Sequence, residues 1–470
     1  MSISSTGDPQ QSVQLCGLSF ENFKAFPSLE NIEVRPLTVL IGRNSSGKSV
    51  VSRLPLLIAS GLSAQAEGPL ELQIPDVDFG RSYVDLIHNR KRYGEIGIGA
   101  SFRTSTSDLS KFFVRLQHFD EYKMFAIKDF MHSDGNSPEM QIEWLGQDPR
   151  APSQTYRLTC GSIVVDPCTI EFHGLWPKLV QPLESDPDVA EVLQRLRENR
   201  ATSSETMDWI PDFISALKKG PLWQITERLW KTAASFNSVM DSITYLLGPF
   251  RKDPARDYRY PGRTPRGVGS RGGNAPDLLG HDALRSKGQT LSLVSQWFET
   301  HLGGWALDVD QQKDTFSLVL RDPRDPDVAV NIVDVGAGIA QVLPIVVQKY
   351  FKSHSAIEIV EQPELHLHPA AHCDVADLYV EAIKSSGARF LIETHSENFI
   401  LRLRRRIAEG KLSKDDVIIY WIEDRDDSES RITPIHIDKD GGVDRWPKSV
   451  FSEDFEEVRA IRQANRRSED

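Results

Sequence analysis

Residues 42–49 of the chain read Gly42-Arg43-Asn44-Ser45-Ser46-Gly47-Lys48-Ser49, which fits the pattern G-x-x-x-x-G-K-[ST]. A strand-like apolar run, residues 37–41, comes directly before the motif, and an apolar helical stretch follows it. A chance glycine-rich turn would lack this order of strand, motif and helix. The stretch therefore predicts a phosphate-binding loop at the start of a helix, within an α/β fold.

The residue types in this loop indicate how it would bind ATP. Glycines let backbone N–H groups close around phosphate oxygens. Lys48 is placed to reach the β- and γ-phosphates, and the Ser49 hydroxyl is placed to ligate Mg²⁺. The candidate ATP-binding residues of the loop are Gly42, Asn44, Ser45, Gly47, Lys48 and Ser49.

A second apolar run, residues 356–364, ends in acid and reads AIEIVEQPE. In a sheet that carries a phosphate loop, the carboxyl ends of the strands face the phosphates, so we expect Glu361 to hold Mg²⁺ through water. A solvated turn is the alternative, but packing alone gives no reason to end a buried strand in carboxylates, which are costly to bury unpaired. This strand end is therefore the expected metal-binding and catalytic edge.

The residue after Glu361 decides how fast such a site would hydrolyse ATP. Gln362 can orient a water molecule but cannot take its proton at neutral pH. Either hydrolysis is slow, or Glu364 or another group supplies the base. The sequence leaves both possibilities open.

Two further segments are placed to complete the site. Residues 334–344 read DVGAGIAQVLP, and the glycines Gly336 and Gly338 would let a ligand approach N–H groups at a helix start, although an ordinary capping turn looks the same. Another buried strand ends in Glu393-Thr394-His395-Ser396, where His395 is placed to hydrogen-bond a γ-phosphate.

Three histidines follow the acidic strand end at the spacing H-x-H-x-x-x-H. A metal site built by His366, His368 and His372 is one interpretation, but no acidic or cysteine ligand completes a zinc set. We therefore expect these side chains to cap or pack a helix.

The chain divides by pattern into three stretches. Residues 1–174 contain β-like segments between polar turns, which predicts an antiparallel, β-rich lobe that includes the phosphate loop. Residues 175–300 predict an inserted helical domain, with a long amphipathic helix over 222–243, and a basic loop. Residues 301–470 alternate short buried strands with helices, as βαβ units do.

Composition places limits on the partners of the chain. It has 470 residues, 39% of them hydrophobic, and a formal charge of −12, so any contact with nucleic acid must be a local patch. The patch that could bind DNA is the basic loop, with positive residues Arg251, Lys252, Arg256, Arg259, Arg263, Arg266 and Arg271. These side chains could instead pair with acids or reach nucleotide phosphates.

The sequence shows neither a signal peptide nor an apolar run long enough to span a membrane, so we expect a cytoplasmic protein.

Together these motifs resemble the bacterial ABC-type ATPases of the RecF, SMC/Rad50 and OLD group. The resemblance lies in residues 19–26, SFENFKAF, and in the motifs EQPELHLHP at 361–369 and THSE at 394–397, and it covers residues 13–60 and about 330–450. It implies a split ATPase head in which residues 336–341 are the signature segment, although the usual serine before the glycines is absent. It also implies that His395 is the switch histidine and that the nucleotide joins two heads.

The resemblance suggests two functions of different kinds. Too little sequence follows His395 for a Toprim nuclease domain, so we expect none, and relatives of this kind work beside a separately encoded effector, often in defence against phage. One hypothesis is therefore a switch whose ATP-bound dimer or higher oligomer controls an effector. The alternative is a RecF-like ATPase that binds DNA in repair or tethering. A small-molecule kinase would need a substrate lid, which the glycine segment and His395 do not suggest.

Overall fold

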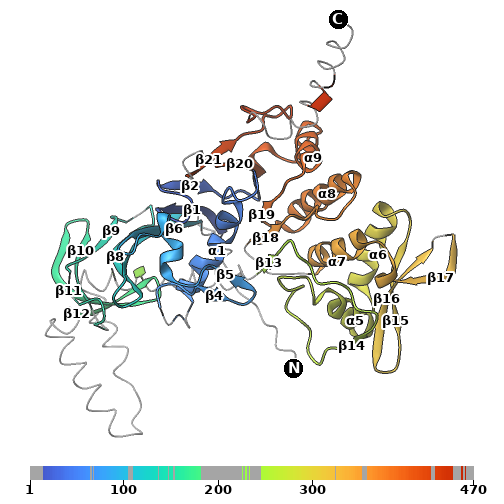
Figure 1. Ribbon diagram of the computed structural model, residues 1–470, viewed down its shortest axis with the longest axis horizontal. Coiled ribbons are helices and arrows are strands. Elements are labelled where there is room, and N and C mark those ends of the chain that lie inside the picture. Colours follow the sequence, from blue (N-terminus) through green and yellow to red (C-terminus); the bar gives the residue numbers. More distant parts are fainter. Residues whose placement is uncertain are drawn as a thin grey trace, which may run out of the picture. The chain divides into compact units, whose positions relative to one another are not determined.

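The computed structural model describes most of the chain and divides it into two compact units (Figure 1). Unit 1 comprises residues 1–33 and 54–243, and unit 2 comprises residues 34–53 and 244–470. Outside the described residues lie 1–13, 64–65, 67, 104–108, 136, 147, 152–153, 182–224, 226–227, 230–231, 233–244, 323, 352–356, 425–428, 448–456, 459–460 and 462–470.

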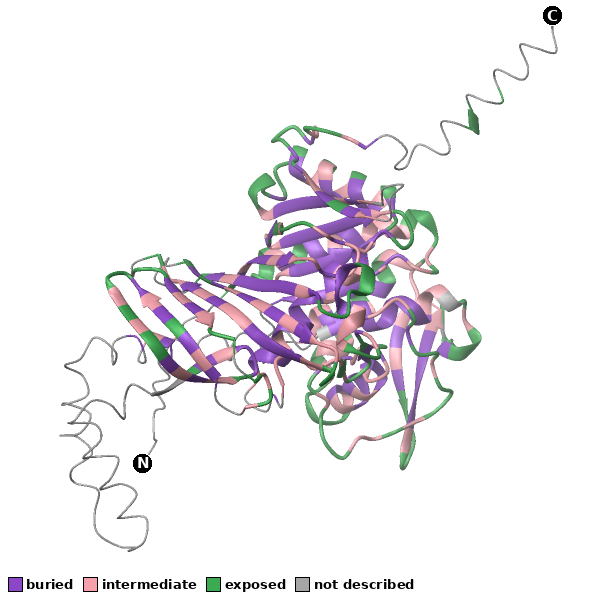
Figure 2. Cartoon of the chain, turned by 60° about the vertical axis from the view of Figure 1, so that its left-hand side comes forward, coloured by how far each residue is buried: buried purple, intermediate pink, exposed green. Residues whose placement is uncertain are grey.

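Unit 1 is built on an antiparallel sheet of nine strands in the order β12-β11-β10-β9-β8-β7-β6-β1-β2. The strands are β1 Gln14–Glu21, β2 Glu30–Glu33, β6 Glu95–Arg103, β7 Leu109–Phe119, β8 Met124–Ser133, β9 Met140–Trp144, β10 Gln154–Cys160, β11 Ile163–His173 and β12 Trp176–Gln181. Along β7 buried residues alternate with more exposed ones, and Figure 2 shows this banding on the strands. The predicted α/β class with an antiparallel, β-rich part is confirmed.

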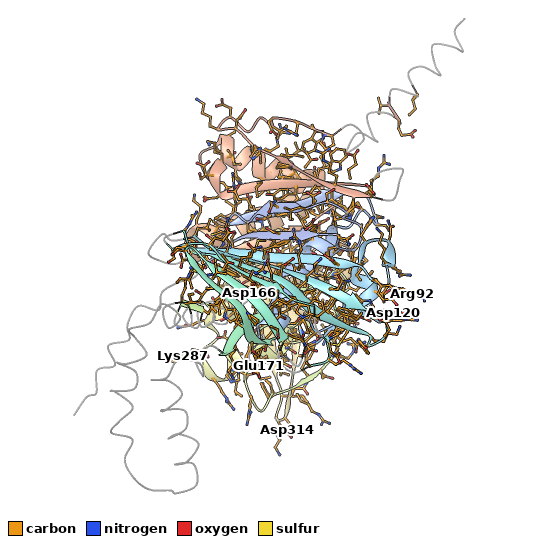
Figure 3. The ribbon with its side chains drawn as sticks, turned by 90° about the vertical axis from the view of Figure 1, so that its left-hand side faces the viewer. Arg92, Asp120, Asp166, Glu171, Lys287 and Asp314 are labelled. Atoms are coloured by element: carbon orange, nitrogen blue, oxygen red, sulfur yellow. The ribbon has the colours of Figure 1, made fainter. Side chains whose placement is uncertain are left out.

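The register of this sheet fixes which charged residues meet at its ends. Because Glu95 of β6 pairs with Gln117 of β7, the start of one strand lies beside the end of the other. Figure 3 accordingly shows Arg92 next to Asp120, and the positive charge of Arg92 helps to lower the pKa of Asp120, after the larger effect of its hydrogen bond with Lys123. The small elements of unit 1 are β4 Gln73–Ile74, β5 Val77–Asp78 and the 3-10 turns η1 Tyr83–Leu86 and η2 His88–Arg90.

Unit 2 contains a six-stranded sheet in the order β13-β18-β19-β3-β20-β21. Its strands are β13 Tyr245–Leu247, β18 Glu358–Glu361, β19 Phe390–Glu393, β3 Leu37–Gly42, β20 Val417–Asp424 and β21 Ser430–Ile435. All neighbours are parallel except β20 and β21. The carboxyl ends of β18, β19 and β3 therefore share one edge of the sheet, where Glu361 pairs with Glu393 and Glu393 with Leu40.

Helices and a second sheet complete unit 2. The helices are α5 Ala275–Arg285, α6 Gln289–His301, α7 Ala337–Tyr350, α8 Pro369–Ser386 and α9 Glu397–Ala408, with 3-10 turns η4 Ile332–Asp334 and η5 Lys414–Asp416. The second sheet contains β14 Tyr258–Arg259, β15 Ala306–Gln311, β16 Thr315–Asp322 and β17 Asp325–Asn331, and Asp314 lies in the turn before β16 (Figure 3). Helix α1, Lys48–Leu62, begins in unit 2 and continues into unit 1. Apolar residues of the strands and helices of unit 2 share one core.

The units divide the chain differently from the three consecutive stretches expected from sequence. The phosphate-loop segment, residues 34–53, groups with the C-terminal half and not with the N-terminal strands. Strands β16 and β17 form an antiparallel hairpin, and the turn η4 comes directly before the segment that contains Gly336. The proposed helical insert and its long amphipathic helix lie mostly outside the described residues. No described helix is long and apolar enough to cross a membrane.

Candidate functional site

The phosphate loop connects β3 to α1 and depends on its glycines. A Cβ on Gly42 would collide with the carbonyl oxygen of Ile422 on the neighbouring strand β20, and Gly47 has a φ of +100°. Side chains other than glycine rarely adopt that conformation. The loop is thus the close-approach turn that the motif predicts.

Lys48 is folded inward onto this loop. Its Nζ donates to the carbonyl oxygens of Gly42 and Arg43, at 3.0 Å and 2.6 Å. The side chain is buried, which lowers the pKa of Lys48, while the nearby charge of Glu393 acts in the opposite direction. The ammonium therefore lies where the loop closes, with carbonyl oxygens as its partners.

Ser49 contacts a carboxylate that the sequence analysis did not assign to the site. Its Oγ donates to Oε2 of Glu393, the last residue of β19, at 2.8 Å. Burial and the charge of Glu361 raise the pKa of Glu393. The signal was present in the sequence, because an acid ends the strand that was expected to carry His395.

Glu361 is held by an arginine of α1. Arg53 donates from Nε to Oε1 at 2.6 Å and from a terminal nitrogen to Oε2 at 2.7 Å, and Ser52 Oγ contacts Oε1 at 3.3 Å. This fork-to-carboxylate geometry is a strong form of ion pair. Arg53 was not predicted; its position one helical turn after Ser49 is the only sequence signal for it.

Gln362 and Glu364, the residues that follow strand β18, hydrogen-bond to different parts of the segment 393–395. Gln362 has a φ of +46° and its N–H donates to the carbonyl oxygen of Glu393 at 2.7 Å. Glu364 is buried, and its Oε1 accepts the backbone N–H of His395 at 2.7 Å. Its Oε2 is buried without a hydrogen-bond partner among the described residues. Glu364 therefore supports the His395 segment from within the protein.

His395 lies close to the phosphate-loop lysine. Desolvation and the positive charge of Lys48 lower the pKa of His395 to about 4. The imidazole is therefore neutral at physiological pH, although the residue retains exposed surface. A neutral ring can donate one hydrogen bond and accept another.

The first arginine of the basic loop is part of this edge. Arg251 is buried, and one terminal nitrogen donates to the carbonyl oxygens of Glu361 and Gln362, at 3.1 Å and 3.0 Å. Arg256 forms two hydrogen bonds with Asp334, at 2.7 Å and 2.9 Å, and Arg271 Nε donates to the Phe250 carbonyl. At least three of the seven basic residues are thus used within unit 2. Exposed residues of the loop include Lys252, Arg259 and Arg263.

The glycine segment forms the start of α7. Gly336 is the N-cap of α7, and among the described residues beyond its chain neighbours no atom lies within 4 Å of where its Cβ would be. A Cβ on Gly338 would lie 2.8 Å from the carbonyl oxygen of His366. The segment therefore packs on the loop that follows β18. In the sheet, β18 is separated from the phosphate-loop strand β3 by β19.

The histidine triplet caps and packs α8, as expected for two of its members. His368 is the N-cap, and its Nδ1 accepts the N–H of Ala370. His372 contacts the Ser396 hydroxyl through Nδ1 and the Leu367 carbonyl through Nε2. Within the part of the chain that the structure describes, no three His, Cys, Asp or Glu side chains are arranged to hold a metal ion.

Comparison with known proteins supports an ATPase domain in this region. Residues 284–400 match the family model described as an AAA ATPase domain, a range that includes Gly336, Glu361 and His395. Residues 412–460 match a family described as a protein of unknown function, DUF3696. No match was found among curated proteins.

Similar solved structures include SMC heads. One is an SMC head bound to the C-terminal winged-helix domain of ScpA, with 13% identity, a TM-score of 0.42, and coverage of 91% of this chain and 98% of that one. The SMC head domain from Thermotoga maritima has 9% identity, a TM-score of 0.37, and coverage of 90% and 100%. An SMC head with an extended coiled coil, bound to the C-terminal domain of ScpA derived from Pyrococcus furiosus, has 12% identity, a TM-score of 0.39, and coverage of 96% and 100%.

The residues at this edge fit Mg²⁺ as it binds in ATPases. The Ser49 hydroxyl and the Glu361 carboxylate offer oxygen ligands of the kind that this ion prefers, and Glu393 accepts the Ser49 hydrogen bond beside them. Such sites use few protein ligands, because the phosphates of the substrate and water supply the others.

Proposed function

We propose that the chain is an ATP-binding and ATP-hydrolysing switch. The observation that carries this proposal is the convergence of Lys48, Ser49, Glu361, Glu393 and His395 at one sheet edge within unit 2. A loop lysine, a hydroxyl, strand-end acids and a neutral histidine are the groups needed to bind a triphosphate with Mg²⁺. The match of residues 284–400 to an ATPase domain supports the same conclusion.

Each group has a distinct task in this proposal. The Lys48 ammonium would exchange its two carbonyl partners for the β- and γ-phosphates, and Ser49 and Glu361 would hold Mg²⁺, Glu361 through water. When bound, Mg²⁺ would neutralise part of the negative charge of the phosphates. Neutral His395 would hydrogen-bond the γ-phosphate, and Gln362 would orient the attacking water.

The proposed output is a nucleotide-dependent assembly that controls a separately encoded effector in bacterial defence against phage. Gln362 cannot act as a base, so the ATP-bound state should persist, which suits a switch better than a motor. The open N-cap at Gly336 supports contact with the γ-phosphate of a second copy. Plaque assays with and without the neighbouring genes test the defence role.

A RecF-like DNA-binding ATPase is the second candidate, favoured by the exposed Lys252, Arg259 and Arg263. It is weaker than the switch, because Arg251, Arg256 and Arg271 have partners within unit 2. Salt-sensitive binding of duplex DNA, lost when Arg259 and Arg263 are both replaced by Ser, would favour it.

The phosphate site is tested by Lys48→Ala. Removing the ammonium should lower ATP affinity by about tenfold to a hundredfold, because charge-assisted hydrogen bonds are worth roughly 1.5–3 kcal/mol. Isothermal titration calorimetry measures this. Lys313→Ala removes an exposed lysine from the turn before β16 and is the matched control, which should bind ATP normally. Unchanged affinity in a folded Lys48→Ala protein would refute the site.

A further inference from the structure

We propose that Glu393, and not Glu361, is the carboxylate that positions the Ser49 hydroxyl for Mg²⁺. Glu393 would be a positioning residue, because it acts through Ser49. This inference rests on the proposed function and adds a residue to its nucleotide site.

The first argument is the hydrogen bond between the two side chains. A serine hydroxyl has one proton to donate and two lone pairs that can face a cation. In this structure the proton goes to Glu393 Oε2, 2.8 Å from Ser49 Oγ. Because Oε2 accepts this proton, it fixes the rotation of the hydroxyl and turns the lone pairs of Ser49 away from Glu393.

The second argument is that Glu361 is otherwise engaged. Both of its carboxylate oxygens accept hydrogen bonds from Arg53, at 2.6 Å and 2.7 Å, and Oε1 also contacts Ser52. The residue is only 2% exposed, so this pairing takes place away from bulk water. Glu361 is thus held by α1 at Arg53 and Ser52, one turn beyond Ser49.

The third argument is the rigidity of the Glu393 backbone. Strand β19 lies between β18 and β3, and Glu393 is in register with Glu361 on one side and Leu40 on the other. Its carbonyl accepts the N–H of Gln362, and the following N–H, of Thr394, donates to Leu40. Lys48 and Arg53 lie close enough to stabilise the buried carboxylate. A side chain on such a framework is well suited to orient another group.

The test measures ATP affinity with EDTA and with Mg²⁺, by calorimetry under conditions without turnover. Wild type should gain affinity with Mg²⁺. In Glu393→Leu, as in Ser49→Ala, the gain in ATP affinity from Mg²⁺ should be about 10- to 100-fold smaller, as expected for the loss of a group that orients a metal ligand. The ATP affinity of both variants in EDTA should equal that of wild type. The double variant Ser49→Ala/Glu393→Leu should be no worse than either single variant, because both changes remove one interaction.

Glu361→Gln is the matched control at the neighbouring strand end. Its effect on the Mg²⁺-dependent gain should add to that of Ser49→Ala. If Glu393→Leu does not fold, Glu393→Gln replaces it; its amide oxygen can still accept from Ser49, so its loss should be smaller than that of Ser49→Ala.

An unchanged Mg²⁺-dependent gain in the Glu393 variant, or losses that add between Ser49 and Glu393, would overturn the inference while leaving ATP binding intact. A wild type that binds ATP under neither condition would overturn the proposed function and this inference with it.

Discussion

Three glutamates near the ends of β18 and β19 have different partners although all are buried. Glu361 faces a guanidinium, Glu393 a hydroxyl, and Glu364 a backbone N–H. For Glu393, burial and the charge of Glu361 raise the pKa, and the hydrogen bond from Ser49 acts in the opposite direction. The partner, more than the residue type, therefore decides which of these acids can hold a cation, orient a ligand or support a loop.

At the residue scale, the contact made by Glu364 bears on the question that the sequence leaves open. Glu364 uses one oxygen to hold the His395 N–H, and its other oxygen is buried. We therefore expect Gln362→Glu to raise steady-state ATP turnover, by up to about 10²-fold, because it places a proton acceptor beside the attacking water. The ATPase rates of wild type and variant measure this effect.

Glu364→Gln is the companion variant. Its amide oxygen can still accept the His395 N–H, so turnover should change by less than about threefold if Glu364 is not the base. A large loss in Glu364→Gln together with no gain in Gln362→Glu would identify Glu364 as the base and would contradict the slow-switch interpretation.

At the scale of elements, the strands were predictable and their side-chain partners were not. Buried parallel strands are short apolar runs, so β3, β19 and β20 could be read directly from the sequence. Arg53 and Glu361 are 308 positions apart, and Ser49 and Glu393 are 344 apart. Only the strand order brings these residues together, and no local pattern in a single sequence encodes it.

The basic loop shows the same limit. Its seven positive charges were interpreted as a surface that could meet DNA phosphates. Arg251 is instead buried and donates to the carbonyl oxygens of Glu361 and Gln362, 110 and 111 residues away. The composition of a segment gives its charge but not the surroundings of each side chain. Arg251 faces carbonyl oxygens and not solvent because the end of strand β18 lies beside it.

Strand β18 also supports a prediction about pH and stability. Burial raises the pKa of Glu358 from 4.5 to about 7, and a hydrogen bond from Gln348 acts in the opposite direction. In the folded state Glu358 therefore keeps its proton between about pH 4.5 and 7, where the unfolded chain releases it. Stability should fall as pH rises through this window and stay lowered above it.

Glu358→Gln removes this titration while keeping an acceptor for Gln348. The variant should be more stable than wild type at pH 8 by roughly 1–2 kcal/mol, below the full linkage value because Glu358 retains some exposure. At pH 5 the two proteins should be nearly equal. Urea unfolding at both pH values measures the difference, and an equal difference at both would exclude titration of Glu358 as the cause.

At the scale of the whole molecule, the candidate site draws on two distant parts of the sequence. Residues 34–53 supply the phosphate loop and Arg53, and residues after 244 supply the acids and His395. Most of unit 1, residues 54–243, is inserted between them. The sequence motifs predicted both halves of the candidate site, but the grouping of the phosphate loop with the C-terminal half depends on the pairing of β3 with β19 and β20.

The proposed assembly is tested best at Gly336. Aspartate is favoured at a helix N-cap, and the space around this position is open, so Gly336→Asp should fold. Gly338 is less suitable, because its Cβ would press on the His366 carbonyl. If the start of α7 meets the γ-phosphate of a second copy, the added carboxylate should repel that phosphate and block association.

Sedimentation with Mg²⁺ and a non-hydrolysable ATP analogue measures the effect. Wild type should shift from monomer to dimer or a higher oligomer, and Gly336→Asp should remain monomeric. Gly336→Asn has nearly the same size and N-cap preference without the charge, so it should associate at least partly, which separates electrostatic repulsion from steric exclusion. Because the change lies in α7 and not in the phosphate loop, ATP binding by the monomer should survive in both variants. Association of Gly336→Asp equal to that of wild type would show that α7 does not meet the phosphate, and a wild type that never changes its association state would remove the basis for a switch by dimerisation.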